Sequence, residues 1–119
     1  MRILIADDNR DAASMLAAIL FDEGHHVECV YNGAEVLPAI RESRPDAVVL
    51  DIKMPGRSGY DVAREIRECY GEARPLLIAV SGHYKKGSDQ VLARVVGFDH
   101  FLPKPCDPNA LVSVLSPRA

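Results

Sequence analysis

RILIADD, residues 2–8, is an apolar run that ends on two adjacent acids, and the same pattern recurs along the chain. Three later apolar runs also lead to a reactive group: AVVL to Asp51, LLIAV to Ser81 and HFLP to Lys104. Short apolar runs separated by helix-like segments are typical of buried parallel strands. Because open parallel sheets bind ligands at the carboxyl ends of their strands, we expect these side chains to meet in one crevice.

The size and composition of the chain predict one domain over residues 1–119. The 119 residues are 48% hydrophobic, and there is no apolar stretch of membrane-spanning length and no signal-like start. We therefore expect a cytoplasmic protein without a membrane partner. The formal charge of -3, without basic clusters, predicts no direct nucleic-acid binding by this chain alone. Cys29, Cys69 and Cys106 lack metal-ligand spacing, which favours three reduced thiols.

The apolar periodicity switches five times between a strand-like and a helix-like pattern. The expected strands are 2–6, 27–31, 47–50, 76–80 and 100–103. The expected helices follow each strand: one with Ala12, Met15, Leu16, Ile19 and Leu20 as its buried face, one between Asn32-Gly33 and Arg44, and three more over 60–70, 89–96 and 107–115. Pro38 falls inside the second helix and predicts a kink or a late start there.

Five β-α units predict an α/β protein. Helical crossovers make the strands parallel and are almost always right-handed, so we expect a doubly wound five-stranded sheet with five helices on both faces. The flavodoxin-like order 2-1-3-4-5 is the best fit. In that order the topological switch point lies between the strands that end in Asp7-Asp8 and in Asp51.

Three carboxylates at such a place favour a divalent cation. Packed together without a counterion, they would repel one another, and Mg²⁺ suits oxygen-rich sites that share substrate phosphates. The alternative for Asp7 or Asp8 is a plain helix cap. Asp51, followed by a turn at Pro55-Gly56, is the better candidate for a nucleophile toward phosphorus.

Lys104 would add a positive charge at this edge and Ser81 a hydroxyl donor. Taken singly, the one could equally be a solvated surface lysine and the other a turn or cap residue.

The motifs together resemble the receiver domain of two-component response regulators, and the resemblance covers the whole chain. It is carried by Asp7-Asp8, by DIKMPGRSG from Asp51, by Ser81 and by Lys104-Pro105. The family resembled is a signalling domain rather than an enzyme, promoting only its own phosphorylation and dephosphorylation.

The resemblance implies a role for each of these residues. Asp51 accepts a phosphoryl group from a sensor histidine kinase or a histidine phosphotransfer protein. Mg²⁺, with Mn²⁺ able to substitute, binds Asp8, Asp51 and the backbone carbonyl of Lys53, and Asp7 acts through a metal-bound water. Ser81 binds phosphoryl oxygens, and Lys104, fixed by a cis bond to Pro105, pairs with the carboxylate or the phosphoryl group.

The resemblance also implies a switch. Ser81 moves toward the phosphoryl group and Phe101 fills the vacated space; the alternative for Phe101 is an ordinary core residue. The surface that changes is the fourth helix, fifth strand and fifth helix, where we expect a downstream protein or a phosphorylation-dependent homodimer. Its residues include Tyr84, Lys85, Lys86, Gln90, Arg94, His100 and Cys106. Lys53 and His83 occupy positions that influence water access, and we hypothesise that Lys53 slows hydrolysis of the phosphoaspartate.

Two other classes share part of this pattern. A haloacid-dehalogenase-like phosphatase places its two acids two residues apart, whereas Asp7 and Asp8 are adjacent and point to opposite sides. A flavin-binding module needs a phosphate cradle where this chain has DDNRD. Within the receiver family, the boundaries fit a free-standing regulator, and GFDHFLPKPCDPNAL is also similar to receivers of hybrid histidine kinases, so a phosphorelay intermediate is the competing reading.

Overall fold

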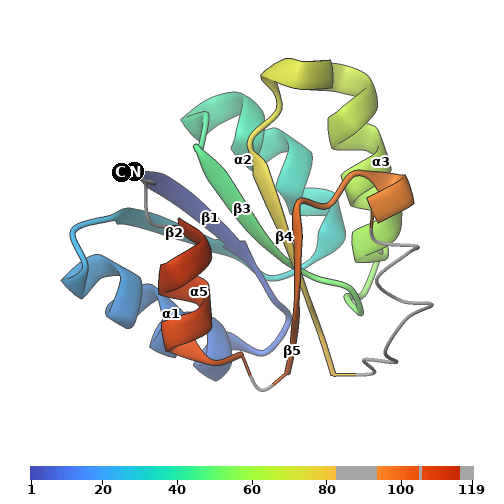
Figure 1. Cartoon of the computed structure of the whole chain (residues 1–119). Helices are drawn as coiled ribbons and strands as arrows, with labels where there is room; N and C mark the ends of the chain where they lie inside the picture. The colour runs from blue at the N-terminus through green and yellow to red at the C-terminus, as the bar shows by residue number, and fades with distance from the viewer. Residues whose placement is uncertain (83–93, 105, 116–119) are drawn as a thin grey trace.

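The computed structural model contains a five-stranded, all-parallel sheet in the order β2-β1-β3-β4-β5, which confirms the predicted topology (Figure 1). The structure describes residues 1–82, 94–104 and 106–115. The strands are β1 (Arg2–Ala6), β2 (His26–Val30), β3 (Ala47–Asp51), β4 (Leu76–Ser81) and β5 (His100–Pro103). All five lie within one residue of their predicted bounds.

Helices cover both faces of the sheet (Figure 1). They are α1 (Arg10–Asp22), α2 (Val36–Ser43), α3 (Gly59–Tyr70) and α5 (Pro108–Leu115), with short 3-10 turns η1 (Gly33–Glu35) and η2 (Gly71–Ala73). Ile3 and Ile5 of β1 pack with α1 and α5, whereas Leu4 and Ala6 pack with α2 and α3. This alternation gives the sheet two apolar cores.

The predicted helix over 89–96 falls largely outside the described residues. Residues 94–96 are helical, and Gly97 follows them with a φ of +110°. Among the described residues, no helix is long and apolar enough to cross a membrane.

Pro38 explains why the second helix starts late, as predicted. The chain first forms η1 after Asn32, whose side chain accepts a hydrogen bond from the Glu35 amide. Pro38 then occupies the first turn of α2, where a backbone N–H has no intrahelical partner to lose.

The predicted buried face of α1 was partly wrong. The buried residues are Ala13, Leu16 and Leu20, whereas Met15 is 67% exposed. The buried residues are spaced three and four apart and form a narrow stripe, and Met15, about 100° around the helix from Leu16, lies outside it.

Arg44 ends α2 in a left-handed conformation, with a φ of +49°. This region is strained for a residue with a Cβ and free for glycine. We predict that Arg44→Gly raises the free energy of unfolding by about 0.5–1 kcal/mol, measured by urea denaturation. Arg41→Gly, at an exposed helical position in the last turn of α2, should instead lower the free energy of unfolding by about 0.5 kcal/mol. Equal losses in both variants would contradict this account.

Candidate functional site

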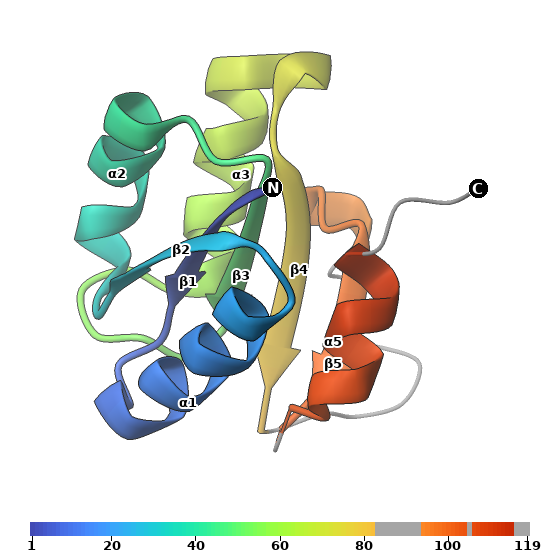
Figure 2. The same cartoon turned by 90° about the vertical axis from the view of Figure 1, so that its left-hand side faces the viewer.

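The carboxyl ends of the parallel strands meet at one edge of the sheet, as expected (Figure 2). Asp7, Asp51 and Ser81 are the buried polar residues among those described, with 5%, 4% and 6% of their surface exposed. Lys104 follows β5, and its amide donates to the carbonyl of Ser81 over 2.9 Å. The ends of four segments distant in sequence are therefore neighbours.

Asp7 and Asp8 leave β1 in different environments. The Asp7 amide donates to the Val30 carbonyl of β2 at 3.1 Å, and its carboxylate accepts from the Asn9 amide at 3.0 Å. Asn9, rather than either acid, caps α1 by accepting from the Ala12 amide at 3.1 Å. The capping alternative therefore does not account for Asp8, which is exposed at the rim of the site.

Three carboxylates form a group that fits a hard divalent cation. Asp7, Asp8 and Asp51 each offer one oxygen, and the three oxygens lie within 4.8 Å of one another. Oxygen donors that leave positions open for water or phosphate are those that Mg²⁺ prefers. The donor set at this edge thus fits the predicted cation.

Lys104 is the counterion to the two buried acids. Its Nζ lies 2.9 Å from Asp51 Oδ2 and 3.3 Å from Asp7 Oδ2. Burial raises the pKa of Asp51 above its usual range, because it outweighs the attraction of Lys104. Burial alone would lower the pKa of Lys104, but the hydrogen bond to Asp51 and the charges of Asp51 and Asp7 hold it above its usual value.

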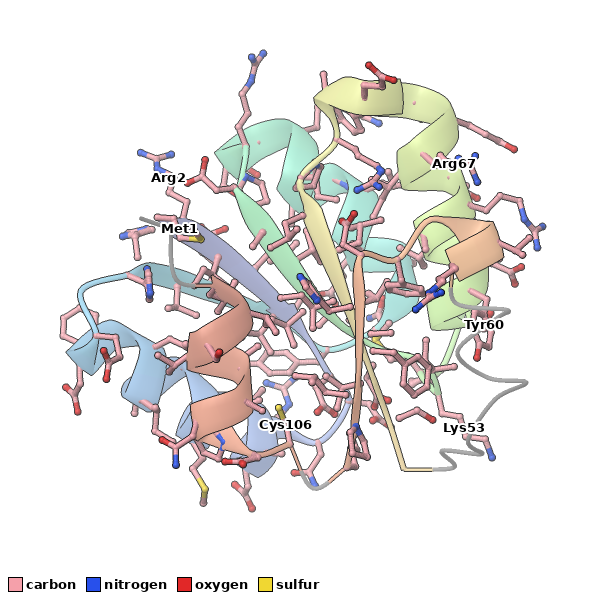
Figure 3. The ribbon with its side chains drawn as sticks, in the orientation of Figure 1. Met1, Arg2, Lys53, Tyr60, Arg67 and Cys106 are labelled. Carbon is pink, nitrogen blue, oxygen red and sulfur yellow. The ribbon has the colours of Figure 1, made fainter. Side chains whose placement is uncertain are left out.

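The loop after β3 follows Asp51 and is held by hydrogen bonds at both of its ends. The Lys53 amide donates to Asp51 Oδ1 at 3.3 Å, and the Gly59 amide donates to the Ile52 carbonyl at 2.7 Å. Gly56 has a φ of +84°, as the predicted type II turn requires. The Lys53 side chain is exposed, and Figure 3 shows it on the opposite side of the carboxyl edge from Cys106.

Sequence reasoning missed the role of Gly59. A Cβ at this position would lie 2.7 Å from the Asp51 carbonyl oxygen and 2.8 Å from Ile52 Cα, so only glycine lets α3 start this close to the site. The available signal was Ser58 before the helix, which caps it by accepting from the Asp61 amide at 3.2 Å.

Some of the remaining predicted residues lie in the described part of the chain and others lie outside it. Phe101 is half-buried on β5 and packs against the core between the sheet and α2 and α3. Arg94 is exposed, and His100 and Cys106 are half-buried. Cys29, Cys69 and Cys106 are all free thiols, as expected. Outside the described residues lie His83, Tyr84, Lys85, Lys86, Gln90 and Pro105 with its predicted cis bond.

An open hollow borders the site between α1 and α5. Its walls include Met15, Ile19, Cys106 and Pro108, and it extends to the carboxylate of Asp51 and to Lys104. The exposed position of Met15, which contradicts the predicted buried face, places an apolar side chain at this hollow.

Comparison with known proteins identifies one family. Residues 3–116 match the family model of the response regulator receiver domain. The DNA-binding response regulators MtrA of Mycolicibacterium paratuberculosis and Mycobacterium tuberculosis are each 37% identical over 117 residues, covering 98% of this chain and 50% of the relative. The chain thus spans about half the length of the curated relatives it matches.

Solved structures agree with this match. A CheY-like response regulator receiver domain protein from Methanospirillum hungatei is 27% identical with a TM-score of 0.86, over 96% of this chain and 89% of that one. Chemotaxis response regulator CheY4 of Vibrio cholerae, 24% identical with a TM-score of 0.84 over 96% and 94% of the two chains, shares the fold. The family match favours a receiver domain over the haloacid-dehalogenase-like phosphatase and the flavin-binding module.

The raised pKa of Asp51 predicts that Asp51→Asn stabilises the cation-free protein at pH 7. Burial raises the pKa of the Asp51 carboxyl in the folded protein. Below the ordinary pKa of a carboxyl, the group is protonated in the folded and the unfolded protein and does not change the free energy of unfolding. Above the raised pKa it is ionised in both states, and its burial then lowers the free energy of unfolding. Urea denaturation with a chelator should therefore show a gain at pH 7 that disappears near pH 3. A loss at pH 7, or an equal gain at both pH values, would contradict the prediction.

Asp99→Asn is the matched control with the opposite sign. Burial alone would raise the pKa of Asp99, but Arg74, at 2.7 and 3.0 Å, and the Leu77 amide hold it below its usual range. The Asp99 carboxylate therefore stabilises the folded protein at pH values above the ordinary carboxyl pKa. This stabilisation is lost as the pH falls through the lowered pKa of the folded state. Because the pair with Arg74 is exposed to solvent, Asp99→Asn should cost about 0.5–1 kcal/mol at pH 7, measured by the same urea denaturation.

Proposed function

The chain belongs to the family of response regulator receiver domains, which are signalling modules of two-component systems, and from this premise we propose that Asp51 is its phosphoacceptor. We further propose that residues 1–119 form a single receiver domain. The observation that carries the proposal is the placement of Asp51 at the end of β3, 2.9 Å from Lys104 and within 4.8 Å of two further carboxylates.

The proposed reaction is a phosphoryl transfer to a carboxylate. An Asp51 oxygen attacks the phosphorus of a phosphohistidine on a sensor kinase or phosphotransfer protein, the P–N bond breaks, and its electron pair stays on the imidazole. The product is an aspartyl phosphate. The chain acts on its own phosphoryl group and has no separate substrate, so we propose a switch rather than an enzyme.

Asp8, Asp51 and the backbone carbonyl of Lys53 would hold Mg²⁺ or Mn²⁺, with Asp7 beside them. When bound, the cation supplies positive charge that offsets the repulsion between the acids and the incoming phosphoryl oxygens. Lys104, 2.9 Å from Asp51, would add a second positive charge, and the Ser81 hydroxyl would donate to a phosphoryl oxygen.

Access to Asp51 supports a protein donor that approaches along α1 and α5. Asp51 is only 4% exposed, and the hollow that reaches it is walled by apolar side chains such as Met15 and Ile19. A partner that covers this hollow would exclude water while the phosphoryl group moves.

The proposed output runs through β5. Phe101 lies beside Ala79 in the register of β4 and β5, two residues before the Ser81 end of β4. Movement of Ser81 toward the phosphoryl group would let Phe101 shift inward and alter the face of the fourth helix, β5 and α5. We propose that this face binds a downstream protein or a second phosphorylated copy.

The kinship with DNA-binding regulators favours an output regulator over a phosphorelay intermediate. DNA contact would then belong to a part of the system other than residues 1–119, whose formal charge is -3. This absence of nucleic-acid binding and the cytoplasmic localisation remain predictions.

Phosphorylation is tested by intact mass after incubation with acetyl phosphate and Mg²⁺. The wild type should gain one phosphate, whereas Asp51→Asn, which keeps the shape of the side chain, should gain none. Chelation of the cation should suppress the adduct. An adduct that persists in Asp51→Asn, or that never forms in the wild type, would refute the proposal.

Lys53→Asn tests the proposed control of phosphoaspartate lifetime. Lys53 is exposed beside the site, and a long cationic side chain there would hinder an attacking water, so the variant should lose phosphate faster. The decay of the adduct after removal of acetyl phosphate gives the rate. An unchanged or slower decay would show that Lys53 has no such effect.

A further inference from the structure

The turn between β2 and α2 contacts the loop that follows Asp51. The Gly33 amide donates to the Pro55 carbonyl at 3.3 Å. A Cβ on Gly33 would lie 2.4 Å from the Arg57 carbonyl oxygen and 2.8 Å from Arg57 Cβ. Both distances are well below van der Waals contact, so the loop can lie where it does only because residue 33 is a glycine.

The same end of β2 contacts the loop that carries Asp7 and Asp8. The Val30 carbonyl accepts from the Asp7 amide at 3.1 Å, and the Arg10 guanidinium lies over the Tyr31 ring, 3.9 Å from its centroid. Residues 30–33 therefore contact both loops that provide the carboxylates. Figure 2 shows the loop after β3 passing beside the segment that leads from β2 into α2.

Two hydrogen bonds between Asn32 and Glu35 stabilise the turn between β2 and α2. Asn32 accepts from the Glu35 amide at 3.1 Å, and its side-chain nitrogen donates to Glu35 Oε1 at 2.7 Å. On its other side, the loop is held by an ion pair between Arg57 and Glu65 of α3. A displacement at Gly33 would thus be transmitted to the loop rather than absorbed by the turn.

We infer that the turn at residues 30–33 sets the separation of the two loops that hold the cation, and that Gly33 is a positioning residue for that site. This inference rests on the proposed function. Mg²⁺ demands near-ideal octahedral geometry, whereas Ca²⁺ accepts irregular coordination at longer distances. A shift of several tenths of an ångström in residues 53–57 therefore penalises Mg²⁺ more than Ca²⁺.

The test is the affinity of the unphosphorylated protein for Mg²⁺ and for Ca²⁺, measured by isothermal titration calorimetry. Gly33→Ala should weaken Mg²⁺ binding about tenfold or more, the usual effect of altering a residue that orients ligands, and weaken Ca²⁺ binding less. Gly24→Ala is the matched control: its φ is +93°, but its Cβ would meet nothing within 4 Å. Alanine is strained at this positive φ, so Gly24→Ala lowers the stability of the fold without touching the loop, and its affinities should equal those of the wild type.

Asn32→Ala gives a second, gentler variant in case Gly33→Ala fails to fold. It removes both hydrogen bonds to Glu35 and should lower Mg²⁺ affinity in the same direction, with a smaller change for Ca²⁺. The Mg²⁺-induced rise in melting temperature should shrink in parallel in both turn variants.

The outcomes separate this inference from the proposed function. The first outcome is that the wild type binds the cation, Asp8→Asn abolishes this binding, and both turn variants bind with unchanged affinity. It would overturn only the role of the turn. Equal losses of Mg²⁺ and Ca²⁺ affinity, or an equal loss in Gly24→Ala, would assign the effect to general destabilisation and also overturn it. No cation binding by the wild type would overturn both.

Discussion

The contact of the Lys104 ammonium with the carboxylates of Asp51 and Asp7 is the interaction on which the rest of the site depends. Burial of two carboxylates beside each other opposes folding, and one cation within 3.3 Å of both offsets that cost. Burial still raises the pKa of Asp51, so a further positive charge beside this carboxylate would stabilise its ionised form. The proposed function assigns that additional charge to a divalent cation beside the three carboxylates.

The parallel topology brings these groups together. With the order β2-β1-β3-β4-β5, the strand ends that carry Asp7, Asp51 and Ser81 are adjacent, and β5 delivers Lys104 beside them. Two local features complete the arrangement. Asn9 takes the role of helix cap and leaves Asp8 at the rim, and Gly59 allows α3 to begin against the Asp51 carbonyl.

The strands and the meeting of their ends were predictable because short apolar runs that end on polar groups are local signals. Pro38 likewise predicted the late start of α2. The face of α1 was not predicted correctly, because Met15 and Leu16 are both apolar and only packing against the sheet distinguishes them. The close contacts of Gly33 and Gly59 were not predicted for a related reason: they join segments that are not adjacent in the sequence. The roles assigned through family resemblance remain proposals.

The energetic coupling of Asp51 and Lys104 is the most direct measure of the central claim that these strand ends form one electrostatic unit. A double-mutant cycle with Asp51→Asn and Lys104→Met, followed by urea denaturation at pH 7 with a chelator, isolates it. The account predicts that Lys104→Met costs at least about 1 kcal/mol more when Asp51 is a carboxylate than when it is an amide. Additive effects within about 0.5 kcal/mol would contradict the account.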